Sequence, residues 1–133
     1  MTHEGKVLVL YEDGKPEIEK GALAIAERLQ EQGREACVKG ASEVGISDIL
    51  AAGMYVLGAD AARSSSFAEL ERVFKGVNLA GRRAAFFGSS GAAVAWLRSL
   101  CADTEAATAH SDFVGRPDAA ALSAWLKAVL AGA

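Results

Sequence analysis

Apolar residues form short continuous runs that alternate along the chain with segments in which they recur at helical spacing. The runs predict strands at residues 7–11, 35–39, 54–57 and 83–87, and a fifth strand within residues 106–114. The spacing predicts helices at residues 16–32, 48–52, from 66 onward, 92–102 and 122–130. This alternation is typical of an α/β protein in which helices cover both faces of a parallel sheet.

Helix ends are predicted from the residues that favour them. Pro16 suits the first turn of a helix, where a missing N–H costs nothing, and Gly33 ends that helix. Ser47 is predicted to cap the short second helix. Ser66 with Glu69 three residues later has the form of a capping box, which predicts the start of the third helix.

Composition indicates a soluble globular protein. The chain has 133 residues, and we expect residues 1–133 to form a single domain. A net charge of −3 gives no electrostatic reason to approach nucleic acid or an anionic membrane. Residues 1–14 lack the basic start and long apolar segment of a secretory signal, and Cys37 and Cys101 lack a CxxC spacing. We therefore expect a cytoplasmic setting and no nucleic-acid or membrane partner.

Three stretches of the sequence resemble the flavodoxin family. Residues 6–29 align without a gap with that family's first strand, phosphate loop and helix. Residues 55–93 are similar to its third strand, third helix and fourth strand, including an L-x-G-(K/R)-(K/R)-x-A-x-F-G run, and residues 115–130 resemble its closing helix. The resemblance implies a flavodoxin-like three-layer sandwich with a five-stranded parallel sheet in the order 2-1-3-4-5. It also implies a ligand site at the carboxyl ends of the strands, which in flavodoxins holds FMN for electron transfer.

The phosphate loop departs from the family pattern. Flavodoxins have a run like S/T-x-T-G-x-T, whose hydroxyls and N–H groups surround the phosphate, and these positions fall on residues 13–18. All three hydroxyls are missing, and Pro16 replaces the glycine. Asp13 and Glu17 would face a group of about −2 charge, and one like-charge contact at about 4 Å costs on the order of 4 kcal/mol at an effective dielectric of 20. Lys15 offsets only part of this repulsion, so we predict that FMN does not bind in the usual pose.

The loops after the third and fourth strands also depart from the pattern. Flavodoxins commonly have an aromatic residue that stacks on the flavin in the first of these loops, but here none precedes Phe67, which is predicted to face the core. The loop after the fourth strand often has a tyrosine, and here Ala93 and Val94 occupy that neighbourhood. Trp96 is predicted to pack between helix and sheet. Without aromatic walls, the affinity for a flavin and the tuning of its potential would suffer.

The candidate binding residues follow the first, third and fourth strands: Glu12, Asp13, Gly14, Lys15, Pro16, Glu17, Ile18, Asp60, Ala61, Gly88, Ser89, Ser90 and Gly91. Our main hypothesis is a flavodoxin-like protein with a lost or rebuilt FMN site, which acts as a binding or interaction module for a small ligand or protein partner. The first alternative is a flavodoxin that binds FMN and transfers electrons. The second is a pocket that binds Mg²⁺, as in the receiver domains of two-component signalling.

The receiver alternative rests on acidic and hydroxyl residues at the strand ends. Glu12, Asp13, Asp60 and the Ser89-Ser90 pair lie where receivers place two acidic residues, an acceptor aspartate and a Ser/Thr around Mg²⁺. In addition, Arg116-Pro117 stands in the region of their Lys-Pro pair. A simpler interpretation is a solvated acidic turn whose carboxylates are favoured by the positive end of the helix.

The turn after the fourth strand offers a further polar feature at the same edge. Residues 88–91 form a second candidate anion cradle, in which Ser89 or Ser90 is also predicted to cap the next helix. His3 and His110 have no spacing or context that would form a catalytic triad with a serine. We therefore expect no enzymatic activity beyond electron transfer.

Overall fold

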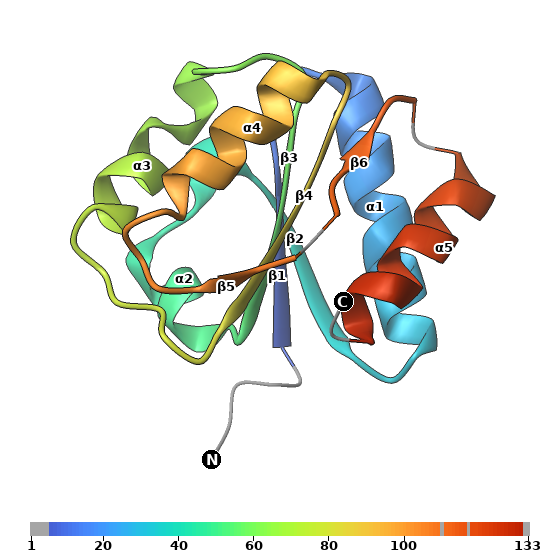
Figure 1. Cartoon of the computed structure of the whole chain (residues 1–133), viewed down its shortest axis with the longest axis horizontal. Coiled ribbons are helices and arrows are strands. Elements are labelled where there is room, and N and C mark those ends of the chain that lie inside the picture. The colour runs from blue at the N-terminus through green and yellow to red at the C-terminus, as the bar shows by residue number, and fades with distance from the viewer. Residues whose placement is uncertain (1–5, 110, 117, 132–133) are drawn as a thin grey trace.

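A computed structural model of the chain describes residues 6–109, 111–116 and 118–131 (Figure 1). The parallel sheet has the order β2-β1-β3-β4-β5, and a further short strand, β6, pairs with β4. The strands are β1 (Lys6–Tyr11), β2 (Glu35–Gly40), β3 (Met54–Ala59), β4 (Arg83–Gly88), β5 (Ala107–Thr108) and β6 (Phe113–Val114). The predicted fold class and strand order are confirmed.

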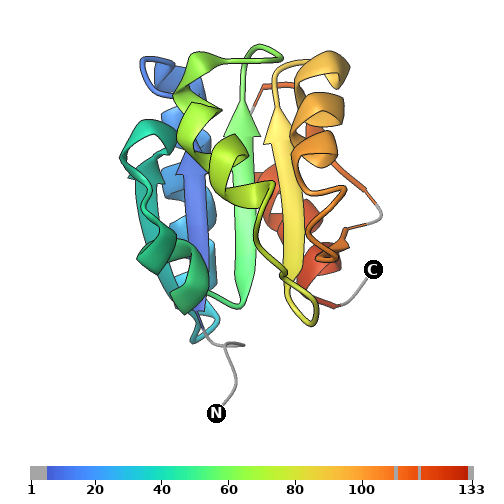
Figure 2. The same ribbon diagram turned by 90° about the vertical axis from the view of Figure 1, so that its left-hand side faces the viewer.

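Helices cover both faces of the sheet. They are α1 (Pro16–Glu31), α2 (Ile46–Ala51), α3 (Ala68–Phe74), α4 (Gly91–Leu100) and α5 (Ala119–Leu130), with the 3-10 turns η1 (Ala41–Glu43) and η2 (Ser65–Phe67). α1 and α5 lie on one face, whereas α2, α3 and α4 lie on the other (Figures 1 and 2). Of the helices formed by the described residues, none combines the length and apolar character needed to cross a membrane.

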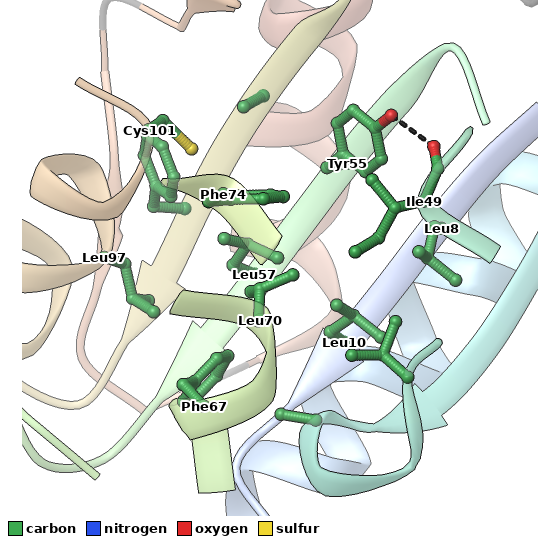
Figure 3. Packing of buried hydrophobic residues seen from close by; sticks show 14 of the residues in the cluster. Leu8, Leu10, Ile49, Tyr55, Leu57, Phe67, Leu70, Phe74, Leu97 and Cys101 are labelled. Carbon is green, nitrogen blue, oxygen red and sulfur yellow. Dashed lines mark hydrogen bonds between the residues drawn. The ribbon is translucent and has the colours of Figure 1, made fainter. Parts of the chain in front are cut away.

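Two apolar clusters fill the spaces between the sheet and the helix layers, because alternate side chains of each strand face opposite sides. Leu8, Leu57 and Phe86 pack toward α2, α3 and α4, as Figure 3 shows for the first two. Tyr55 is fully buried in this cluster, and its hydroxyl donates to the Ile49 carbonyl at 2.5 Å (Figure 3). The buried hydroxyl is thereby satisfied, as a polar group in a core must be. The second cluster joins the sheet to α1 and α5.

One helix cap predicted from the sequence is wrong and another is confirmed. Gly45 precedes α2, and the Asp48 carboxylate accepts from the Gly45 N–H at 2.9 Å, so Ser47 lies inside the helix. The Asp48 carboxylate in the first turn of α2 thus satisfies the N–H of the residue that precedes the helix. A serine cap accepts from amides inside the first turn and would leave this N–H to water. At α4, the Ser90 hydroxyl accepts from the Ala93 N–H at 3.2 Å, which confirms the predicted serine cap.

The capping box predicted at Ser66 is also wrong. Ser66 lies inside η2, where its N–H donates to the Ser64 hydroxyl at 3.3 Å, and α3 begins two residues later. The Ser66 hydroxyl instead accepts from the Asp13 N–H at 3.1 Å. Glu69 forms an ion pair with Arg72 along the helix. The local spacing fits a capping box, but a tertiary contact takes the hydroxyl.

The predicted fifth strand is divided into the two short strands β5 and β6. β5 pairs with the start of β4 and β6 with its end. Between them, the Arg98 guanidinium of α4 donates to the Thr108 hydroxyl at 2.9 Å, the Ala109 carbonyl at 2.8 Å and the Asp112 carboxylate at 2.6 Å. Arg98 thus contacts described residues at the end of β5 and before β6.

The two cysteines differ in burial, and this difference predicts their reactivity. Cys101 is 3% exposed, and burial raises the pKa of its thiol to about 12, whereas Cys37 is half-buried on β2. Because the thiolate is the reactive form, we expect Ellman's reagent to titrate one thiol in the folded protein and two in urea. The Cys37→Ser variant should show no reaction until it unfolds. Rapid reaction of that variant under native conditions would contradict the assignment.

Candidate functional site

The candidate residues lie on loops at the carboxyl edge of the sheet, toward which the arrowheads point in Figure 2. Loop 1 (residues 12–15) joins β1 to α1, loop 3 (residues 60–64) joins β3 to η2, and loop 4 (residues 89–90) joins β4 to α4. Because β1, β3 and β4 are neighbours and parallel, the three loops meet at one edge.

Glu12 connects loop 1 to loop 3. Its side chain is only 5% exposed, although it belongs to an acidic loop. One carboxylate oxygen, Oε1, accepts from the N–H of Asp60 at 2.7 Å and from that of Ala61 at 3.1 Å. The Glu12 N–H in turn donates to the Gly58 carbonyl at 3.0 Å. A carboxylate that accepts two backbone N–H groups is a strong, charge-assisted link, so loops 1 and 3 are held together by the chain itself.

Asp13 turns in the opposite direction, toward η1. Its carboxylate accepts from the Ser42 N–H at 3.0 Å and from the Ser42 hydroxyl at 2.7 Å. A Cβ at Gly40 would lie 2.7 Å from this carboxylate, so glycine leaves the space that the contact needs. Burial acts to raise the pKa of Asp13, but the hydrogen bonds from Ser42 outweigh it and hold the pKa below its ordinary value.

The lowered pKa of Asp13 predicts a pH-dependent contribution to stability. Asp13→Asn should lower the Tm at pH 7 by about 3 °C, which corresponds to roughly 1 kcal/mol for weakened hydrogen bonds. A carboxyl whose pKa falls on folding stabilises the protein above its unfolded pKa of about 3.9 and loses that effect as the pH falls through the folded value. The Tm difference between parent and variant, measured by thermal unfolding, should therefore be constant above about pH 5 and shrink below pH 4. A difference independent of pH would contradict this assignment.

Asp60 connects loop 3 to loop 4 and to loop 1. The Ser89 hydroxyl lies 2.5 Å from Asp60 Oδ1 and 3.1 Å from the Asp60 carbonyl, and Lys15 Nζ lies 3.4 Å from Asp60 Oδ2. The hydrogen bond from Ser89, followed by the charge of Lys15, lowers the pKa of Asp60 below its ordinary value. All three loops are therefore linked by direct polar contacts.

The structure thus brings together only some of the residues predicted from the sequence. Glu12, Lys15, Asp60, Ala61 and Ser89 converge at the loop contacts. Glu17 on α1 and the buried Ile18 lie with Asp60 and Ser89 around a cavity described below, and Asp13 faces η1. The remaining candidates take structural positions: Gly14 adopts a positive φ of 75°, Pro16 begins α1, Gly88 ends β4, Ser90 caps α4 and Gly91 begins it.

Sequence reasoning missed Ser42 altogether, although this serine binds the Asp13 carboxylate through both its N–H and its hydroxyl. Its only signal is a position two residues after the end of β2, which is too common to be informative. The local spacing predicts a helix cap at Ser66, whereas its hydroxyl accepts from the Asp13 N–H of loop 1. Both serines contact residues more than 25 positions away in the chain.

The interpretation of loop 1 as a solvated acidic turn is wrong for Glu12, which is buried. Helix α1 receives no side-chain cap, so neither Glu12 nor Asp13 satisfies its first amides. Only Glu17 and Glu19, in the first turn of α1, are exposed carboxylates near its positive end.

A metal site receives no support from the part of the chain that is described. Among residues 6–109, 111–116 and 118–131, no group of three or more His, Cys, Asp and Glu side chains is arranged to hold a metal ion. Glu12 faces loop 3 whereas Asp13 faces η1, so the two acidic residues do not converge as the receiver alternative requires. His3, His110 and Pro117 lie outside the described residues.

Phe67 and Trp96, which follow loops 3 and 4 in the chain, pack in or against the hydrophobic core. Phe67 is fully buried, as predicted, and Trp96 is half-buried. The two rings lie edge to face, with centroids 5.5 Å apart and an interplanar angle of 80°. Trp96 therefore packs on Phe67 and the core beneath it. Neither of these rings is placed to stack on a flavin between loops 3 and 4.

A cavity of about 190 Å³ remains at this edge, lined by Glu17, Ile18, Asp60, Ser89, Gly115 and Arg116. Sites for ligands of drug size usually measure roughly 300–1,000 Å³. FMN is a ligand of that size, and the two loops that would flank its ring are joined by the bond from Ser89 to Asp60. For a flavin ring to lie between loops 3 and 4, the bond from Ser89 to Asp60 would have to break.

Solved flavodoxins resemble this chain over nearly its whole length. A short-chain flavodoxin associated with a PDU bacterial microcompartment superimposes with a TM-score of 0.84 at 14% identity and covers 99% of both chains. Oxidised flavodoxin 2 from Bacillus cereus matches with a TM-score of 0.82 at 17% identity, over 96% of this chain and 99% of its own. Two-electron reduced flavodoxin from Megasphaera elsdenii matches with a TM-score of 0.71 at 22% identity, over 96% and 99%. No family model and no curated protein matches the sequence. The likeness confirms a flavodoxin-like fold.

Proposed function

We propose that this protein is a flavodoxin-like binding module with a rebuilt FMN site, and that it holds a small ligand or a protein partner at the carboxyl ends of its strands. The observation that supports this function is the set of direct contacts among loops 1, 3 and 4. Glu12 occupies two amides of loop 3, while Asp60 is bound by both Lys15 and Ser89.

The contacts of Glu12 and Asp13 give the acidic residues of loop 1 a structural role in a flavodoxin-like fold. A phosphate needs several unoccupied N–H or hydroxyl donors at the strand ends. Here the Asp60 and Ala61 amides donate to Glu12, and the Ser42 hydroxyl donates to Asp13. The carboxylates of Glu12 and Asp13 thus accept hydrogen bonds from donors that a bound anion would otherwise use. These contacts hold the loops at the carboxyl edge of the sheet together without a cofactor.

The proposal includes a cytoplasmic setting without nucleic-acid or membrane partners. Two free thiols and a net charge of −3 support it.

The alternative function is electron transfer by bound FMN, and the observation in its favour is the similarity to solved flavodoxins with TM-scores of 0.82–0.84. That function would require loop 4 to separate from loop 3, with loss of the bond from Ser89 to Asp60.

Equilibrium dialysis against FMN tests the proposed function. We expect the purified protein to retain no FMN, whereas a flavodoxin dialysed in parallel should retain one FMN per chain. The readout is flavin absorbance near about 450 nm, which belongs to the cofactor itself. Retention of one FMN per chain by this protein would contradict the proposal and establish the electron-transfer alternative as the next hypothesis.

A further inference from the structure

The cavity at the strand ends has one apolar wall and one basic wall. Ile18 supplies the apolar side from the first turn of α1, and its side chain belongs to the core cluster beneath. Arg116 supplies the basic side from the segment between β6 and α5. Ser89 lines the cavity between them. The cavity can therefore take a molecule with one apolar and one polar end.

The charges around the cavity are unequal. Each carboxylate that lines it has a cation nearby: Glu17 lies 4.0 Å from Lys20 Nζ, and Asp60 lies 3.4 Å from Lys15 Nζ. Arg116, by contrast, makes no ion pair or hydrogen bond with any residue in the described part of the chain. Among the residues that line the cavity, Arg116 is thus the one cation, and no described residue neutralises it.

We infer that the cavity binds a small monocarboxylate, with its carboxylate on Arg116 and its apolar end against Ile18. The planar guanidinium matches a carboxylate through two parallel hydrogen bonds. A dianion such as a phosphate ester would place a second negative charge beside Glu17 and Asp60, and the lining residues include no second cation to balance it.

The size of the cavity sets the scale of the ligand. A volume of about 190 Å³ corresponds to roughly six water molecules at ~30 Å³ each. Butyrate matches this scale, and a nucleotide exceeds it. The inference rests on the proposed function, because FMN seated at the strand ends would cover the same cavity.

Three probes with the same carbon chain and different charges test the inference. The ¹⁵N-labelled protein is titrated with butyrate, 1-butanol and butylammonium, and affinities are read from amide chemical shifts. We expect butyrate to shift the Ile18, Ser89 and Gly115 signals and to bind at least tenfold more tightly than 1-butanol, in line with a charge-assisted hydrogen bond. Butylammonium should bind no better than 1-butanol.

Arginine variants identify the responsible charge. Arg116→Gln should lower the butyrate affinity at least tenfold, to the level of 1-butanol. Arg63→Gln is the matched control, because Arg63 is an exposed arginine of loop 3 that does not line the cavity, and it should leave the affinity unchanged. Equal effects of the two substitutions, or tighter binding of butylammonium than of butyrate, would overturn the inference.

The outcomes separate this inference from the proposed function. If no probe shifts the cavity signals and dialysis shows no retained FMN, the monocarboxylate site is wrong while the rebuilt-site proposal stands. If FMN is retained, the proposed function fails whatever butyrate does.

Discussion

Glu12→Ala is expected to lower the free energy of unfolding by about 2–4 kcal/mol, although the substitution removes an acidic residue from an acidic loop. The Glu12 carboxylate accepts from the Asp60 and Ala61 amides, and it is 5% exposed. Hydrogen bonds to a charged group contribute about 1.5–3 kcal/mol each, and their loss leaves two amides at a partly buried edge with access only to water. Urea denaturation of parent and variant gives the difference.

Two further variants distinguish this bracing role from a general effect of charge. Glu17→Ala removes the same charge from the exposed first turn of α1 and should cost less than about 1 kcal/mol. Glu12→Gln keeps an oxygen acceptor and should cost less than Glu12→Ala. Equal costs for alanine at the two positions would show that the contacts of Glu12 to loop 3 do not stabilise the fold.

Restoring the family pattern in loop 1 is expected to raise the affinity for FMN at least tenfold. The substitutions are Asp13→Ser, Lys15→Thr and Pro16→Gly, which return two hydroxyls, the glycine and its N–H. They also remove the Asp13 carboxylate, which faces η1 in the parent, and the Lys15 ammonium, so the net charge of the loop is unchanged. Ile18 is left unchanged, because it is 2% exposed in the core and threonine there would add a stability loss. Equilibrium dialysis measures retained FMN.

Adding Ser89→Ala to the repaired loop distinguishes two barriers to FMN binding. One is repulsion of the phosphate by loop 1, and the other is the contact that joins loops 3 and 4. Ser89→Ala removes the bond to Asp60 and should increase the affinity of the repaired loop further. The double variant Asp103→Ser, Lys75→Thr is the control for the two charge changes, since both residues are exposed outside the three loops, and it should have no effect. A repaired loop that binds FMN no better than the parent would refute the repulsion argument. If Ser89→Ala alone produced the whole gain, closure would be the sole barrier.

Local patterns were sufficient to predict most elements of this fold. The continuous apolar run at β3 and the helical spacing in α1 reflect burial of whole faces, which a short stretch of sequence records directly. The split of the fifth strand was not predictable in this way, nor was the contact of the Arg98 guanidinium, which reaches Asp112 from another element. Neither residue has a local signal for this contact.

The location of the candidate site could be predicted from the sequence, but the contacts among its side chains could not. Its location followed from the strand order that the resemblance to flavodoxins implies, since in that order the loops after β1, β3 and β4 meet at one edge. The directions of the side chains did not follow. Glu12 and Asp13 are adjacent in the chain, yet one binds loop 3 and the other binds η1, because the chain has left β1 at Tyr11 and turns at Asp13 and Gly14.

The amino-acid sequence by itself determined the α/β class, because this class depends on the periodicity of apolar residues. The strand order and the missing phosphate-loop hydroxyls followed from the resemblance of the sequence to flavodoxins. Only the tertiary structure decided what the acidic residues do. Glu12 bonds to amides 48 and 49 positions away, and Asp13 to a serine 29 positions away. The energy of such contacts depends on distances that exist only after the sheet has formed, so no local pattern in the chain encodes them.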